Sequence, residues 1–218
     1  MCTVIVRTGA PLTLMGVRDE LADRPWEGPG EHWPEYPGVV GGRDLKAGGT
    51  WLAVDPAAGR AAALLNGRGT AAPDNVRVSR GDLPLKALAE GGLPDVDLAA
   101  YDPFHLLLAD VSGARLWSWD GVRQAALTLP DGVSVIVNTG LDSGDPRVQA
   151  QRPRFTATTD WWPLTDGPHS SAPGALILRH ELPDGRLYAS LSVTMVTLSA
   201  DAVTTEFRDL TSRIGSQA

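Results

Sequence analysis

The chain holds a single cysteine, Cys2, directly after Met1. Removal of Met1 would leave the thiol on a residue that also carries a free α-amine, whose ordinary pKa of ~7.7–8.0 lets it accept the thiol proton near neutral pH. Nucleophile and base would then share one residue, which suits acyl transfer through an acyl-enzyme. The alternative for Cys2 is a small buried side chain at the beginning of an edge strand, because cysteines are commonly buried and inert.

Two charged residues, Arg18 and Asp19, are candidates to act beside this thiol. Turn residues at 8–11 predict a β-hairpin that brings the end of its second strand near Cys2. A guanidinium there would lower the pKa of the thiol, and a carboxylate would hold the α-ammonium. Neighbouring strand residues point to opposite faces, so both can address Cys2 only if the strand ends or bulges between them. A surface ion pair is the alternative.

Two asparagines, Asn66 and Asn138, are candidate donors for the oxyanion that acyl transfer generates. Each ends an apolar stretch that is expected to be a strand, and a neutral amide held by a sheet suits this role. The alternative for both is ordinary turn chemistry, since Asn before Gly or Thr often begins a turn.

A block around Thr50 and Trp51 is the first candidate for substrate binding. Two glycines, Gly48 and Gly49, precede it, and a close backbone approach to a ligand or a neighbouring strand would explain them. Trp51 is either a core residue or a pocket wall.

Three further charged residues complete the candidates. Arg43 and Asp44 are expected to form a second charged pair near the mouth of the site, and Arg147 to meet an anionic group. No metal site or cofactor is predicted, because the four histidines lie far apart in the sequence and the one cysteine is not grouped with any of them.

Length and charge limit the class of protein. A chain of 218 residues can close one large core, so residues 1–218 are interpreted as one domain. The formal net charge is −7 and basic residues are scattered singly, which argues against a nucleic-acid partner. The absence of a long apolar run or a signal peptide argues against a membrane span and favours the cytoplasm. The oligomeric state is left open.

Apolar alternation and turn residues predict a strand-rich chain with few short helices. Strands are expected at 3–7, 12–17, 50–54, 60–66, 105–111, 115–119, 124–128, 133–138, 175–181, 187–192 and 202–209. Helices are expected at 79–92, 95–101 and 145–151. Residues 22–42, rich in proline, tryptophan and glycine, are expected to be an ordered loop without a regular element, of a kind that often covers a site.

Several sequence blocks occur in an order typical of one family. They are MCTVIV, VRDE, GGRDLKAGGTWLAV, AALLNGRG and VNTGLDSGDPRVQ. Together they resemble the NRDE family, also called the TANGO2-like (transport and Golgi organisation) family, from Cys2 to about Gln151. The sequence departs from the family signature at Val17, where Asn is usual, so the function of that amide is absent or supplied elsewhere.

The resemblance implies an α+β fold, a four-layer αββα sandwich of two antiparallel sheets like that of the N-terminal-nucleophile hydrolases. The family is thereby similar to the choloylglycine hydrolase and penicillin V acylase group, which implies that Met1 is removed. Those enzymes separate their Arg and Asp by two residues, which favours Arg18 over Asp19 as a direct contact. They keep an oxyanion Asn where VNTG falls here, which makes Asn138 the first choice and Asn66 the second.

Two functions from different classes follow. The first is a cysteine N-terminal-nucleophile hydrolase that cleaves an amide or thioester of a small or lipid-like acyl group. The second is a non-catalytic carrier or chaperone that holds haem or an acyl-lipid ligand in the same pocket, since proposals for the family range from haem trafficking to acyl-thioester handling. A base and an oxyanion donor beside Cys2 favour the enzyme, whereas Val17 favours the carrier.

Overall fold

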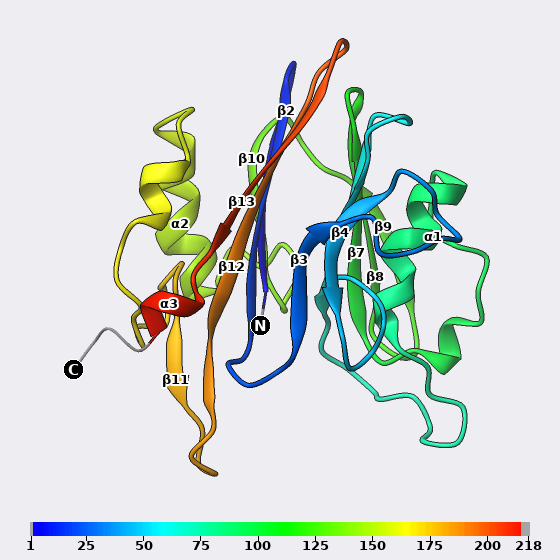
Figure 1. Cartoon of the computed structure of the whole chain (residues 1–218), viewed down its shortest axis with the longest axis horizontal. Helices are drawn as coiled ribbons and strands as arrows, with labels where there is room; N and C mark the ends of the chain where they lie inside the picture. Colours follow the sequence, from blue (N-terminus) through cyan, green and yellow to red (C-terminus); the bar gives the residue numbers. More distant parts are fainter. Residues whose placement is uncertain (1, 215–218) are drawn as a thin grey trace.

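The computed structural model describes residues 2–214, which are built mainly from β-strands in two antiparallel sheets (Figure 1). The first sheet has the order β10-β1-β2-β12, and β11 and β13 share the far edge of β12. The second has the order β3-β4-β5-β6-β7-β8-β9. The strands of the first sheet are β1 (Thr3–Thr8), β2 (Leu12–Leu21), β10 (Gly132–Ile136), β11 (Arg179–Glu181), β12 (Leu187–Leu198) and β13 (Val203–Asp209). Those of the second are β3 (Trp26–Gly30), β4 (Val40–Asp44), β5 (Leu52–Asp55), β6 (Arg60–Asn66), β7 (Phe104–Asp110), β8 (Gly113–Trp119) and β9 (Gln124–Thr128).

A shared apolar core joins the two sheets. Alternate residues of β1 point to opposite faces, so Val4 and Val6 pack with Leu65 and other residues of the second sheet. Ile5, between them, packs in a separate core with Phe155 of α2 (Pro146–Thr156). β1 is therefore buried on both faces, which explains its continuous run of apolar residues.

The helices cover the outer faces of the sheets, with α1 (Leu83–Glu90) and α2 on opposite sides of the sheet pair (Figure 1). Leu85 and Leu88 of α1 pack on the second sheet, and Gly91 ends this helix in the left-handed region at φ 72°. The remaining short helices are η1 (Arg80–Asp82), η2 (Leu98–Ala100), η3 (Trp162–Thr165) and α3 (Thr211–Ile214). Within residues 2–214, no helix is long and apolar enough to cross a membrane.

The first hairpin, the strands at 60–66 and 124–128 and the helix within 79–92 are confirmed. The expectation that residues 22–42 lack regular structure is wrong, because Trp26–Gly30 forms β3 and Val40 begins β4. β3 lies at a sheet edge, where the missing N–H of Pro29 breaks no central ladder.

Other boundaries also need correction. The helix expected at 95–101 is reduced to η2, and the strand expected at 175–181 to Arg179–Glu181. The helix at 145–151 continues to Thr156, and the strand at 187–192 continues to Leu198 because it pairs with β2 along its whole length. β2 itself runs to Leu21, so its charged pair lies inside the strand and not at its end.

Candidate active site at the cavity beside Cys2

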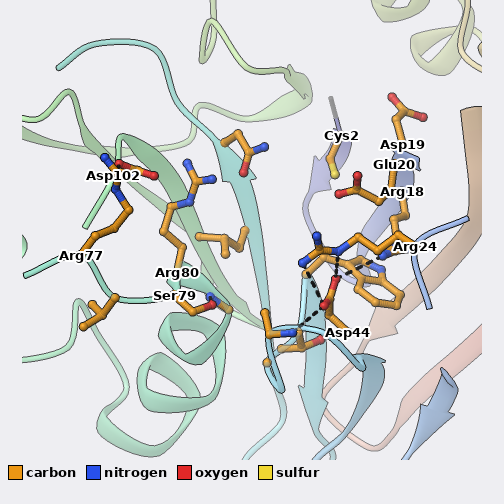
Figure 2. Close-up of a pocket in the computed structure, with 18 residues that line it drawn as sticks. Cys2, Arg18, Asp19, Glu20, Arg24, Asp44, Arg77, Ser79, Arg80 and Asp102 are labelled. Carbon is orange, nitrogen blue, oxygen red and sulfur yellow. Dashed lines mark hydrogen bonds and ion pairs between the residues drawn. The ribbon is translucent and has the colours of Figure 1, made fainter. Parts of the chain in front are cut away.

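A cavity of about 430 Å³ is lined by Cys2, by the last residues of β2 and by the loop at 77–81. Its lining carries four arginines and four carboxylates, which are Arg18, Arg24, Arg77, Arg80, Asp19, Glu20, Asp44 and Asp102. Figure 2 shows Arg77, Arg80 and Asp102 on one side of the cavity and Cys2, Arg18 and Glu20 on the other. The cavity is thus strongly charged, with both signs on each wall.

The Cys2 residue is half-buried and packs against the core between the sheets. Burial is the main reason that the pKa of its thiol is raised, and the Asp19 carboxylate raises it further. A hydrogen bond from the Asp19 backbone and the charge of Arg18 act in the opposite direction. At neutral pH this thiol therefore needs a nearby base to become a nucleophile.

The Arg18 side chain lies on the cavity side of β2 and is only 3% exposed. Its guanidinium carbon stands 4.2 Å from the ring centroid of Trp51 and 5.4 Å from that of Trp26. Nη2 donates to Asp44 Oδ2 at 3.5 Å, whereas Nη1 has no hydrogen-bond partner among residues 2–214. Burial lowers the pKa of Arg18, and the charges of Cys2, Glu20 and Asp44 oppose this.

Asp19 is held by groups on the other face of the first sheet. Arg147 Nη1 donates to Asp19 Oδ2 at 2.8 Å and to Thr3 Oγ1 at 2.6 Å, and Ser190 Oγ donates to Asp19 Oδ1 at 2.6 Å. Neighbouring residues of a strand normally point to opposite faces, as expected for Arg18 and Asp19. Opposite these two residues, however, the register of β12 shifts between Ser190 and Ser192, which is the kind of bulge that lets both reach the same cavity. Asp19 still lines the cavity, but Arg147 does not. Burial raises the pKa of Asp19 against the effects of Arg147 and Ser190.

Arg43 and Asp44 were expected to form a second charged pair near the mouth of the site, but only Asp44 lines the cavity. Its carboxylate accepts from Arg24 Nε at 2.6 Å and from Arg24 Nη2 at 3.0 Å, in addition to Arg18. These hydrogen bonds outweigh its burial and lower the pKa of Asp44. Arg43 Nε is buried without a hydrogen-bond partner in the described part of the chain.

Of the two glycines before Thr50, Gly49 makes the close backbone approach that was expected, but to Gly81 of η1 and not to a neighbouring strand. A Cβ on Gly49 would stand 2.3 Å from the backbone of Gly81, and Thr50 N donates to Gly81 O at 2.8 Å. This contact fixes the loop at 77–81 as the far wall of the cavity. Thr50 and Trp51 both line the cavity, so Trp51 serves as pocket wall as well as packing against the core.

The two asparagines occupy different positions. Asn66 is exposed and lines the cavity, whereas Asn138 is half-buried and does not line it. Asn138 O accepts a hydrogen bond from His105 Nε2 at 3.3 Å, and its Oδ1 is buried without a partner among the described residues. Asn66 thus shares the cavity with Cys2, whereas Asn138 follows shortly after the end of β10, the strand that pairs with β1 just after Cys2.

The sequence analysis did not identify several charged residues of the cavity, on the wall that carries Cys2 and on the wall opposite. Glu20 shares the face of Arg18 two residues away, so the alternation of β2 could have found it. Arg24 also lines the cavity and was not singled out. Arg77, Arg80 and Asp102 follow no motif and stand outside any strand, and no local signal indicates them.

Comparison with known families gives one match. A family model described as Transport and Golgi organisation 2 matches residues 1–171. No curated protein was found to match the chain.

Proposed function

The chain belongs to the Transport and Golgi organisation 2 family, and on this basis we propose that it is a cysteine N-terminal-nucleophile hydrolase. Its substrate would be an amide or thioester of a small or lipid-like acyl group. One observation carries the proposal: the sole thiol, an arginine on its own side of the sheet and an aspartate from the next position line the same cavity. In this proposal residues 1–218 form one cytoplasmic domain with a four-layer αββα architecture.

The first half of the reaction forms the acyl-enzyme. After removal of Met1, the α-amine of Cys2 accepts the thiol proton and Sγ attacks the substrate carbonyl carbon, whose π electrons move to oxygen. Collapse of this tetrahedral intermediate breaks the bond to the leaving amine or thiol, which takes the proton from the α-ammonium. Water, deprotonated by the same amine, then attacks the thioester, and collapse releases the acid and returns the proton to Sγ.

The surrounding residues have separate roles in this scheme. Arg18 lowers the pKa of the thiol, and the buried carboxylate of Asp19 orients the α-ammonium. Asn66, which lines the cavity with Cys2, would donate to the oxyanion in this scheme. Asn138, which follows the strand paired with β1, is the other candidate donor. Arg147, which pairs with Asp19, acts as a positioning residue and not as a substrate contact.

A carrier of haem or an acyl-lipid ligand is the second candidate function. The raised pKa of Cys2 favours it, since a protonated thiol is a poor nucleophile. Two observations count against the carrier. The Arg18 guanidinium stacks on the Trp51 ring, so this aromatic face is not free to contact an apolar ligand. The arginines of the lining could bind the acidic groups of haem or an acyl lipid, but the charged lining does not suit the large apolar part of either ligand.

Intact-mass spectrometry with a slow thiol-directed acylating probe tests the hydrolase. We expect the purified protein to lack Met1 and Cys2 to react faster than in urea-unfolded protein at pH 7.5. A form that retains Met1 should lose this advantage, and Cys2→Ser should take up no label through a thiol. Retention of Met1 in the native protein, or reaction no faster than in the unfolded control, would reject the mechanism and direct attention to ligand binding.

A further inference from the structure

Arg80 stands on the far wall of the cavity and forms no ion pair with the carboxylates of the described residues. Its Nη1 donates to Pro103 O at 2.7 Å, and no carboxylate in residues 2–214 lies within ion-pair distance of it. The neighbouring Arg77 has two carboxylates, from Asp74 at 2.9 Å and Asp102 at 3.1 Å. Arg80 is thus the arginine of this wall whose charge is left to the cavity.

The near wall offers a second incompletely satisfied guanidinium. Arg18 is 3% exposed, its Nη1 has no hydrogen-bond partner among the described residues, and its contact with Asp44 is long at 3.5 Å. Asp44 is already engaged by Arg24 and by the backbone N–H groups of Lys46 and Ala47. A buried donor without an acceptor is costly, so a ligand that supplies an anion relieves that cost.

The acidic residues of the cavity restrict where such an anion can sit. Glu20 lies beside Cys2 on the near wall, whereas Arg80 with Ser79 faces them (Figure 2). Burial lowers the pKa of Arg80, and the charge of Asp102 on the same wall opposes this only in part, since Asp102 is within ion-pair distance of Arg77 and not of Arg80. An anion is therefore repelled next to Glu20 and attracted to the opposite wall.

We infer that the cavity selects substrates in which a carboxylate or phosphate group, a few bonds from the reacting carbonyl, is received by Arg80. The position of the carbonyl at Cys2 rests on the proposed function, but the binding of the anion does not. A planar guanidinium forms paired hydrogen bonds with both kinds of group, so the shared chemistry is an oxyanion. The neutral part of the substrate then spans the space between Arg80 and Cys2.

A set of three ligands tests this inference without any arginine variant. They share an octanoyl amide and differ only in the head group: N-octanoyl-β-alanine, N-octanoyl-aminoethyl phosphate and the neutral N-octanoyl-β-alaninamide. Calorimetric titration into Cys2→Ala protein, which cannot form an acyl-enzyme, measures binding alone. We expect at least one anionic ligand to bind roughly tenfold to a hundredfold more tightly than the neutral one. Equal affinity of all three would overturn the inference, and the two anionic arms decide between carboxylate and phosphate.

Matched variants then locate the anion. Arg80→Gln should abolish the preference, while Arg68→Gln, an exposed arginine that does not line the cavity, should preserve it. Glu20→Gln should keep or increase it, because a repulsive charge is removed. Preserved preference in Arg80→Gln would overturn the assignment. If the protein with Cys2 intact hydrolyses these amides but binds all three ligands equally, this inference fails and the proposed hydrolase function stands. If it prefers the anionic ligands but hydrolyses none of them, the hydrolase function fails and this inference stands.

Discussion

Two arginine–carboxylate clusters flank the same segment of β2 and differ in their access to solvent. Behind the sheet, Arg147 pairs with Asp19 at 2.8 Å, and their side chains are 4% and 0% exposed. On the cavity side, Asp44 pairs with Arg24 at 2.6 Å and with Arg18 at 3.5 Å, and its side chain is 14% exposed. Asp19 also lines the cavity, but Arg147 does not, whereas Asp44, Arg18 and Arg24 of the second cluster all line it.

The difference separates a positioning role from a binding role. Each carboxylate oxygen of Asp19 accepts from a donor on another element, Arg147 or Ser190, so the carboxylate is held in one position. In the cavity cluster, Arg18 keeps a buried nitrogen without a partner in the described chain. Charged groups that are fully paired stabilise a geometry, whereas incompletely paired ones attract a ligand.

The largest effect is expected from Arg147→Met. It leaves the Asp19 carboxylate buried without its ion-pair partner, which should lower the free energy of unfolding by about 3–5 kcal/mol. Urea unfolding at pH 7.5 measures this change. The double variant Arg147→Met with Asp19→Asn serves as the control and should recover most of the loss, because no buried charge remains. Equal destabilisation in both proteins would show that packing, and not charge, dominates this cluster.

An intermediate effect is expected from Asp44→Asn. Loss of the partly exposed ion pairs should cost about 1–2 kcal/mol of unfolding free energy. Arg18 is then left uncompensated near Cys2, so the pKa of the thiol should fall and its alkylation at pH 7.5 should accelerate by up to about tenfold. Asp166→Asn, which breaks an exposed pair with Arg208, is the control and should change neither quantity measurably. A loss as large as that of Arg147→Met would erase the distinction between the clusters.

The smallest effect is expected from the pH dependence of His105, a buried residue of β7. Burial lowers its pKa, and the hydrogen bond to Asn138 O opposes this only in part. As the pH falls through the ordinary histidine pKa of ~6.5, the unfolded chain binds a proton that the folded protein does not. Stability should therefore decrease from pH 7.5 to about 6 and level off once the folded protein also binds the proton.

Urea midpoints at a series of pH values measure this slope. His105→Gln should flatten it, whereas the same change at the exposed His180 should not. An unchanged slope in His105→Gln would mean that other groups carry the pH dependence.

Local pattern was sufficient for much of the fold. Alternating apolar residues and turn chemistry located the hairpin of β1 and β2 and the strands β6 and β9. It was insufficient where pairing lengthens an element: β12 continues to Leu198 because β2 and β13 hydrogen-bond to it on both sides. It also missed β3, since prolines indicate a loop unless the strand lies at an edge.

The candidate site also contains residues that the local sequence could identify and contacts that it could not. Cys2, Arg18 and Asp19 came from one hairpin, and all three line the cavity, although the Asp19 carboxylate also accepts from Arg147 and Ser190. Arg147 was selected as an anion contact, but the anion it meets is Asp19, which lies 128 residues earlier in the chain. Nothing local could distinguish an internal carboxylate from a bound one.

The sequence by itself determined which face of each strand a side chain occupies, because the two-residue period of a strand is a property of the local backbone. The preference for Arg18 over Asp19 as the direct contact of Cys2 came from the resemblance to the choloylglycine hydrolase group and not from this period. Only the tertiary structure decided what stands opposite, since the far wall depends on where the Gly49 backbone meets Gly81 and brings Arg80 to the cavity. Such contacts are set by the packing of distant segments, and no local propensity encodes them.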